Sequence, residues 1–452
     1  MSLLNKIEDD NFVGRSLRNL LSLYPYEKWK LGTAFFQFYA LLFKNEKLSL
    51  EEAQAYQLKE LQRVVNQAYN NTSFYKEKYD KTGFHPSQLK TLADLKLIPI
   101  LTRDEVKNNG EKMIDKTFKG KLYKSVTSGT TAKPLTIYRD KATAQKEYAA
   151  ICYQWSRIGY QPGDGRIEFR GILTKETTFI QLQHERVLRV NIIEMAEDNV
   201  DAILESIKKS GYNYIHGYPG SIYKFFKLVK EKHGKFPTDI EIDAFLLASE
   251  NIFDWQIELM REMIPTAKVI CHYGQAEKVA LGAWNNDENY HFIPSYSITE
   301  IEQNNIIGTS FISDVMPLIR YEVNDAMELK AERSIGDKSL FPVVSAISGR
   351  MEDITYTTEG KSVPPALVTF PFKNLKLVES CKIIQNTKTE FDVIIQSPSN
   401  RKVLNEEITE LKEKMKVIYG ESATFNFSVT TKIPLTKNGK FKWVECKYQK
   451  DN

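Results

Sequence analysis

Apolar and polar positions alternate with different periods along the chain. Over residues 51–71 apolar side chains recur at helical spacing, and we predict that residues 1 to about 70 form a helical cap on the main domain. From residue 121 to about 270, short apolar runs alternate with amphipathic segments, which predicts a mainly parallel sheet flanked by helices. The clearest expected elements are helices over residues 221–233 and 254–264 and strands over residues 244–248 and 267–272.

The pattern changes towards the C-terminus. Residues 291–301 and 307–313 are expected to be strands of a β-rich subdomain. In the last hundred residues, strand patterns over 381–385, 391–396 and 424–429 surround one amphipathic helix, which predicts a small α+β domain. The expected fold class is therefore α/β, with a large domain over residues 1–349 and a small one over residues 350–452.

The most apolar run covers residues 31–43, which is too short to span a bilayer and contains Gln37. We expect a buried helix there, although its five aromatic residues leave open docking on a membrane or a partner. Polar and acidic residues crowd positions 5–12, so no secretory signal is expected.

Composition narrows the class of protein. A net charge of +4 over 452 residues argues against a nucleic-acid-binding protein. The four cysteines are far apart in the sequence, which disfavours a disulfide scaffold and fits a reducing, cytoplasmic compartment.

One stretch, residues 125–135, has the composition of a phosphate-binding loop. Small hydroxyl side chains surround a glycine, and a lysine follows: Thr127, Ser128, Gly129, Thr130, Thr131 and Lys133. Glycine lets the backbone approach a ligand closely, and free N–H groups with one cation suit phosphates. The spacing is not that of a Walker loop, and a plain surface turn is the alternative interpretation.

This stretch and four others, in order, resemble the motifs of the adenylate-forming ligases. The loop is similar to that of the phenylacetate–coenzyme A ligase branch. Residues 216–219 and the Tyr-Gly-Gln-x-Glu form are similar to the CapK-like branch, which is associated with capsular polysaccharide synthesis. The remaining matching stretches are residues 273–277, 316–321 with Asp325, 349–353 and 433–440.

The resemblance implies an enzyme that activates a small carboxylic acid with ATP, releases pyrophosphate and passes the acyl group to coenzyme A. It assigns Tyr273 and Gly274 to the nucleotide site, with the Tyr273 ring stacked on adenine. It places Ser249 and Glu250 at the adenine pocket, and Asp325 would accept hydrogen bonds from both ribose hydroxyls.

The same resemblance implies the groups that handle charge. Glu277 would bind Mg²⁺ through a hard oxygen ligand, and Arg350 would contact ribose or phosphate. Lys440 would be the catalytic lysine, brought to the reacting carboxylate by a mobile small domain that swings about residues 350–353. Tyr218 and the two residues after it are expected to border the acyl pocket by analogy.

The chain also departs from the family pattern. Glu322 replaces an arginine, and Glu352 stands where the family has a hinge aspartate. Residues 285–288 lack the cysteines that some relatives carry, so no zinc is expected. Two alternatives therefore stay open: transfer of the acyl group to an amino sugar or carrier without coenzyme A, and an inactive relative that binds nucleotide as a scaffold.

Overall fold

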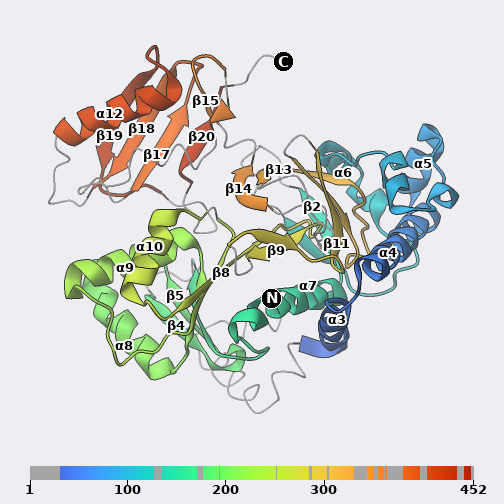
Figure 1. The fold of residues 1–452 in the computed structure, drawn as a ribbon, viewed down its shortest axis with the longest axis horizontal. Coiled ribbons are helices and arrows are strands. Elements are labelled where there is room, and N and C mark those ends of the chain that lie inside the picture. The colour runs from blue at the N-terminus through green and yellow to red at the C-terminus, as the bar shows by residue number, and fades with distance from the viewer. Residues whose placement is uncertain are drawn as a thin grey trace.

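The computed structural model describes most of the chain. The described residues are 31–126, 135–170, 177–192, 194–250, 252–284, 288–302, 305–329, 344–350, 355–360, 362–363, 380–397, 405–434 and 442–448. Figure 1 shows a large domain crossed by one sheet and a small C-terminal domain beside α10 (Asp254–Met263). The fold is the predicted α/β class with an α+β unit at the end.

The helical cap expected over residues 1 to about 70 can be compared with the structure only from residue 31, because residues 1–30 lie outside the described part. From there on the chain is helical, and the helices continue past residue 70. They are α3 (Gly32–Asn45), α4 (Leu50–Asn71), α5 (Ser73–Thr82) and α6 (Arg103–Asn109). Ser49 and Glu52 close a capping box at the start of α4, and Thr102 and Glu105 close the predicted one at α6. Both boxes satisfy backbone N–H groups that a helix start leaves without partners.

The predicted buried helix at residues 31–43 is α3, and only one side of it is covered. Phe35, Phe38 and Leu42 are buried, whereas Phe36 and Phe43 remain 46% and 38% exposed. Within the described part of the chain, no helix is both long and apolar enough to cross a membrane.

A single sheet of twelve strands runs through the large domain in the order β11-β12-β13-β14-β10-β9-β8-β7-β6-β3-β5-β4. The strands β5, β3, β6, β7 and β8 pair in parallel, and the others pair antiparallel. Their bounds are β3 (Arg166–Arg170), β4 (Phe179–Leu182), β5 (Val187–Asn191), β6 (Tyr214–Gly217), β7 (Ala244–Ala248), β8 (Lys268–Gly274), β9 (Leu281–Trp284), β10 (Tyr290–Phe292), β11 (Ser297–Glu302), β12 (Asn305–Ser310), β13 (Tyr321–Leu329) and β14 (Val344–Arg350).

The sequence prediction needs one correction in the antiparallel half. We expected one strand over residues 291–301, but the structure has β10 and β11 separated by a turn in which the Tyr296 N–H donates to the Ile293 carbonyl. Pro294 lies in this turn and lacks the N–H that a continuing strand needs. The β-rich part is also continuous with the parallel part, because β8 pairs with β9.

Helices cover the parallel strands. They are α7 (Lys141–Trp155), α8 (Val200–Ser210), α9 (Pro219–His233) and α10. The central strand β7 is buried along its whole length, as expected for a parallel strand with both faces covered. The main core joins these helices to the sheet and to α3.

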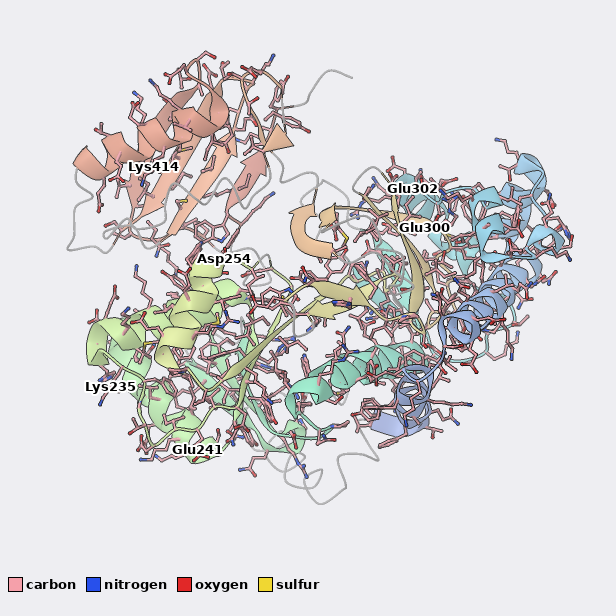
Figure 2. All side chains as sticks on the ribbon, in the orientation of Figure 1. Lys235, Glu241, Asp254, Glu300, Glu302 and Lys414 are labelled. Atoms are coloured by element: carbon pink, nitrogen blue, oxygen red, sulfur yellow. The ribbon has the colours of Figure 1, made fainter. Side chains whose placement is uncertain are left out.

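A second core lies under the cap. It joins α4 and α5 to the hairpin of β1 (Tyr123–Val126) and β2 (Thr136–Arg139) and to residues 316–321. Arg320 connects strand β11 to the segment before α6. Its guanidinium donates to Glu300 and Glu302 of β11 and to the Ile98 carbonyl. Figure 2 labels both carboxylates on β11.

The small domain has a core of its own. Its sheet has the order β19-β18-β17-β20, and α12 (Asn405–Tyr419) packs on it through Leu411, Met415 and Tyr419. The strands are β15 (Thr355–Tyr356), β16 (Ser362–Val363), β17 (Ser380–Gln385), β18 (Glu390–Gln396), β19 (Thr424–Thr430) and β20 (Val444–Cys446). The sequence pattern located β17 to β19 and the helix but missed the short strands β15, β16 and β20, which have too few residues for a recognisable period.

Candidate active site

The predicted phosphate loop closes the β1–β2 hairpin. Thr127 to Lys133 lie outside the described residues, but the two strands that flank them pair from Tyr123–Arg139 to Val126–Thr136. The hairpin is anchored below: Leu135 and Ile137 are buried, and the Tyr138 N–H donates to the Met316 sulfur at 3.4 Å. The predicted loop residues therefore connect β1, which is largely exposed, to β2, whose Ile137 is buried.

Two of the predicted nucleotide residues contact each other directly. Tyr273 ends the parallel strand β8, Asp325 lies in the antiparallel strand β13, and the Tyr273 hydroxyl donates to Asp325 Oδ2 at 2.5 Å. Burial, and then the Asp325 carboxylate, raise the pKa of Tyr273 well above its usual value, so the phenol keeps its proton. The Tyr273 ring meets the Phe292 ring edge to face, with centroids 6.3 Å apart.

The backbone of Arg350 lies opposite Asp325. The two residues are paired across β13 and β14, and Gly349 pairs with the next residue of β13. The structure thus brings these two predicted site residues together although 24 residues separate them in the chain. Gly274 follows Tyr273 at the end of β8 and lies against Leu281 of β9.

Glu277 is buried three residues after Gly274. Only 6% of it is exposed, the Tyr321 hydroxyl donates to its Oε1 at 3.3 Å, and the Arg103 guanidinium lies 3.7 Å from the same oxygen. Arg103 is the first residue of α6, next to the capping residue Thr102. Sequence reasoning did not connect Arg103 or Tyr321 to Glu277, and no local motif signals a contact between residues so far apart.

A second buried ion pair lies beside Glu277. Lys278 has a positive φ of 58° and donates to Glu147 Oε2 at 2.9 Å, and the Tyr296 hydroxyl donates to the same oxygen at 2.6 Å. Burial lowers the pKa of Lys278, and the Glu147 carboxylate opposes that shift. The pair fixes the turn after β8 to α7, which holds the Glu277 backbone in place.

Ser249 and Glu250 directly follow β7. Ser249 has a positive φ of 69°, and Glu250 Oε2 accepts from the Gly220 N–H at 3.2 Å. Gly220 is the second residue of α9, where a negative charge is favoured by the helix dipole. The structure gives Glu250 the role of anchoring the start of α9 next to Tyr218.

The described residues contain no cluster of side chains that could hold a metal ion without further ligands. Among them, no three or more His, Cys, Asp or Glu side chains gather in one place. The one buried carboxylate of Glu277 fits Mg²⁺ in another way, because this ion is commonly bound through one or two carboxylates together with substrate phosphates. The Glu277 carboxylate is thus compatible with a metal that arrives with a nucleotide.

The small domain touches the large one through aromatic rings. Lys440 and Glu352 lie outside the described residues, but Trp443, three residues after Lys440, is described. Its ring centroid lies 5.8 Å from that of Trp255 on α10 and 6.2 Å from that of Phe253. Tyr223 on α9 packs on the Trp255 ring from within the large domain, and Figure 2 labels Asp254 at this boundary.

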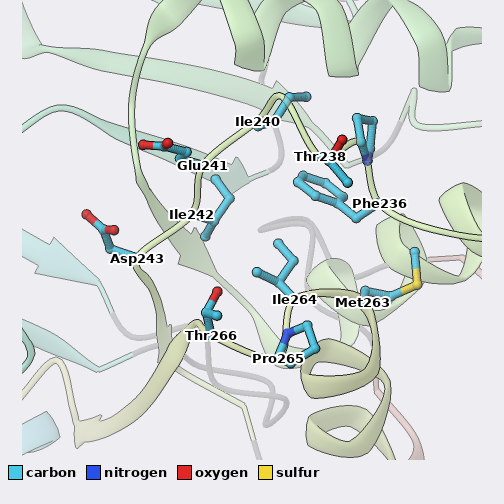
Figure 3. A pocket seen from close by; sticks show the side chains of 11 residues that line it. Phe236, Thr238, Ile240, Glu241, Ile242, Asp243, Met263, Ile264, Pro265 and Thr266 are labelled. Carbon is cyan, nitrogen blue, oxygen red and sulfur yellow. The ribbon is translucent and has the colours of Figure 1, made fainter.

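A cavity of about 430 Å³ lies elsewhere. It is lined by residues 236–238, 240–243 and 263–266, which precede β7 and β8 (Figure 3). It therefore opens at the amino ends of these strands. Tyr273, Glu250 and Arg170 all follow or end strands at the opposite, carboxyl edge, where open parallel sheets bind ligands.

Comparison with known proteins finds relatives along most of the chain. The model of the CapK C-terminal domain matches residues 355–447. Protein CapK of Staphylococcus aureus is 23% identical over 402 residues, which cover 84% of this chain and 86% of that protein. A phenylacetate–coenzyme A ligase of Pseudomonas putida is 21% identical over 70% of this chain and 74% of its own. The chain is thus similar over most of its length to CapK and to the phenylacetate–coenzyme A ligases.

A solved adenylate-forming ligase has the same architecture. The 2-hydroxyisobutyryl-CoA ligase, crystallised in the postadenylation state with an acyl-AMP, superposes with a TM-score of 0.70 over 90% of this chain and 91% of that one. The identity is 15%, so this likeness concerns the fold. It extends over both domains of this chain.

Proposed function

We propose that this chain forms an acyl-adenylate from a carboxylic acid and ATP. A carboxylate oxygen attacks the α-phosphorus, the bond from that phosphorus to the bridging oxygen breaks, and pyrophosphate leaves. The observation that carries the proposal is the Tyr273–Asp325 hydrogen bond beside buried Glu277, at the carboxyl edge of the sheet in a ligase fold.

The nucleotide would lie between the end of β8 and the middle of β13. In this proposal Asp325 accepts hydrogen bonds from the ribose hydroxyls, and its bond from Tyr273 orients the carboxylate. Tyr273, Gly274, Ser249 and Glu250 border the adenine. The hydroxyls and N–H groups of residues 127–133 hold the phosphates, and Arg350 contacts ribose or phosphate.

Two charges complete the proposed site. Glu277 would hold Mg²⁺, and the bound ion would offset the negative charge of the triphosphate. Lys440 would meet the negative charge that develops around the α-phosphorus. Arg103 and Tyr321, which contact Glu277, would orient its carboxylate.

Coenzyme A is the proposed acceptor in the second step. The thiol attacks the acyl carbon of the adenylate and AMP leaves, after residues 350–452 have moved as one domain and removed Lys440. Support comes from the relatives, since both the Pseudomonas ligase and the crystallised enzyme are named as CoA ligases. A second acceptor, an amine on a sugar or carrier, is favoured by the longer match to CapK.

The first experiment is ATP–pyrophosphate exchange with Mg²⁺ over a panel of acids, without coenzyme A. We expect exchange with one class of acid and a loss of about a hundredfold or more in Lys440→Ala. Lys414→Ala is the matched control, because Lys414 lies on α12 of the same domain and pairs with Glu410 at the surface (Figure 2). ATP binding without exchange for any acid would instead support the scaffold alternative.

The acceptor is tested next with the acid that exchanges. Adding coenzyme A should give an acyl-CoA thioester, which its mass distinguishes from the acyl-adenylate, with release of AMP. If coenzyme A leaves the rate unchanged while an amino sugar yields a stable amide, the acceptor is the amine and the first half of the proposal stands.

A further inference from the structure

A buried carboxylate organises three arginines on one face of the sheet. Glu168 lies in the middle of β3 and is 3% exposed. Arg166 donates to its Oε1 through Nε at 2.9 Å and Nη2 at 2.6 Å. Arg189, its neighbour on β5, donates to Oε2 through two nitrogens at 3.2 Å. Two bidentate arginines thus compensate the single charge of Glu168.

The third arginine has a different environment. Arg170, two residues further along β3, keeps its Nε 4.0 Å from Glu168 Oε2, and its Nη2 donates to His216 Nε2 at 3.2 Å. His216 Nδ1 donates to the Leu246 carbonyl at 2.7 Å, so the ring is neutral and Nε2 is an acceptor. Burial, and then Arg170, lower the pKa of His216 to about 3, in agreement with a neutral ring.

Arg170 is therefore oriented but only partly compensated. A neutral imidazole fixes the direction of its guanidinium but removes none of its charge, and Arg170 shares the single charge of Glu168 with Arg166 and Arg189. Among the described residues of β3 and β5, three arginines around one glutamate leave an excess of positive charge. Because the Arg170 side chain is 48% exposed, the excess charge is available to a ligand.

The position of Arg170 relates it to the acyl side of the site. It ends β3 at the carboxyl edge, and the strand order places β6 and β7 between it and the end of β8 that carries Tyr273. Burial raises the pKa of Tyr218, at the start of α9, and the charge of Arg170 opposes that rise. Burial lowers the pKa of His272, and the charge of Arg170 adds to that shift. The negative charge of Glu250 raises the pKa of Tyr218. The Glu250 carboxylate accepts a hydrogen bond from the Gly220 N–H.

Unsatisfied polar atoms gather at the same place. Trp155, the last residue of α7, is 2% exposed and packs on the rings of His216 and His272, at 5.0 and 5.9 Å. Within the described part of the chain, neither the Trp155 indole N–H nor His272 Nδ1 has a hydrogen-bond partner. Buried polar atoms without partners are costly, and a polar ligand group would satisfy them.

We propose that Arg170 binds a second anionic group on the acyl part of the substrate, so that the preferred acid is a dicarboxylic acid or carries an equivalent negative charge. The inference rests on the proposed adenylation and names its substrate class. One carboxylate of the acid reacts with ATP, and the other, at the far end of the acyl chain, forms a charge-assisted pair with the guanidinium.

The test compares matched acids in ATP–pyrophosphate exchange. The probes are succinate, glutarate, adipate and terephthalate, each against its own monomethyl ester, which keeps the length and removes one charge. We expect kcat/KM for at least one diacid to exceed that of its ester by about tenfold or more. Arg170→Gln should remove this preference by lowering diacid exchange alone, and Arg170→Lys should restore part of it.

The control variant is Arg261→Gln, whose guanidinium pairs with Glu288 at the surface of α10, and it should keep the full preference. Unchanged ester exchange in Arg170→Gln shows that the variant is folded. If the wild-type chain prefers esters or uncharged acids, or if Arg170→Gln and Arg170→Lys both lower all acids equally, the inference is wrong and adenylation stands. If no acid of any class supports exchange, adenylation itself fails and the inference fails with it.

Discussion

Tyr273 and Asp325 are joined by a 2.5 Å hydrogen bond between the last parallel strand and the antiparallel half of one continuous sheet. The bond links β8 to β13, which are separated by β9, β10 and β14 in the strand order. Tyr273 lies near the end of β8 and Asp325 in the middle of β13, so both halves of the large domain contribute a residue to the proposed nucleotide site.

This pair yields the first prediction. Tyr273→Phe removes the donor that orients Asp325, and we expect kcat/KM for ATP to fall about three- to tenfold, whereas Asp325→Asn should cost about a hundredfold because a ribose acceptor is also lost. Exchange kinetics at varied ATP measure both. Tyr69→Phe is the matched control, since Tyr69 donates to Asp80 at 2.8 Å at an exposed site. An equal loss in Tyr69→Phe would point to a general effect on folding.

Glu277 gives a prediction about magnesium. Glu277→Gln keeps the size of the side chain and an oxygen for Tyr321, but it removes the charge, so the Mg²⁺ concentration at half-maximal exchange should rise about tenfold or more. A titration with Mg²⁺ at fixed ATP measures this shift. Glu288→Gln, at the surface, should leave the titration unchanged. If Glu277→Gln lowers the rate with no shift in the Mg²⁺ midpoint, Glu277 has a structural role beside Arg103.

The buried histidines predict acid sensitivity. Burial lowers the pKa of His216 to about 3 and of His272 to about 4, from a usual value of 6.5. The unfolded chain therefore binds more protons than the folded chain below pH 6.5, and stability present above that pH is lost as the pH falls towards 4. The expected slope is about 1.4 kcal/mol per pH unit for each histidine.

Urea unfolding of the large domain at pH 7.5, 6.5, 5.5 and 5.0 measures this slope. Glu168, whose pKa is held below its usual value by the arginines against the effect of burial, adds to the loss only below about pH 4.5. His216→Gln cannot be protonated and should have a shallower slope between pH 6.5 and 5. A slope identical to that of the wild type would mean that His216 is protonated in the folded chain.

The contact between Trp443 and Trp255 predicts a coupling between domains. Each ring pair adds about 0.5–1.5 kcal/mol, so Trp443→Ala and Trp255→Ala should each lower the exchange rate about two- to tenfold by weakening the docked arrangement. The double variant should be no worse than either single one, because both remove the same contact. Val417→Ala, on an 85% exposed position of α12, is the control. Fully additive losses would contradict a shared role.

Local signals in the sequence predicted local structure well. The capping box at Thr102 and Glu105 and the strand over 244–248 follow from residues that interact with near neighbours. The helix predicted over 221–233 starts two residues earlier, at Pro219, whose fixed φ suits the first turn. The single strand predicted over residues 291–301 was wrong, because Pro294 interrupts the ladder between β10 and β11.

Contacts between distant residues could not be predicted in this way. Nothing near Glu277 in the sequence indicates Arg103, and nothing near Arg170 indicates that His216 accepts its hydrogen bond. These pairings depend on the order of strands in the sheet and on where the cap packs. The roles of residues 127–133, Glu352 and Lys440 stay predictions from the motifs.

The ring of Trp443 against that of Trp255, inclined at 69°, also gives the molecule an optical signal of its own. Neighbouring indoles couple their electronic transitions, and the strength of the coupling depends on their separation and mutual angle. Near-ultraviolet circular dichroism should therefore change whenever the small domain leaves α10, and a Trp443→Phe difference spectrum isolates this signal from the other four tryptophans. Domain movement during turnover could then be followed in real time on the unlabelled chain.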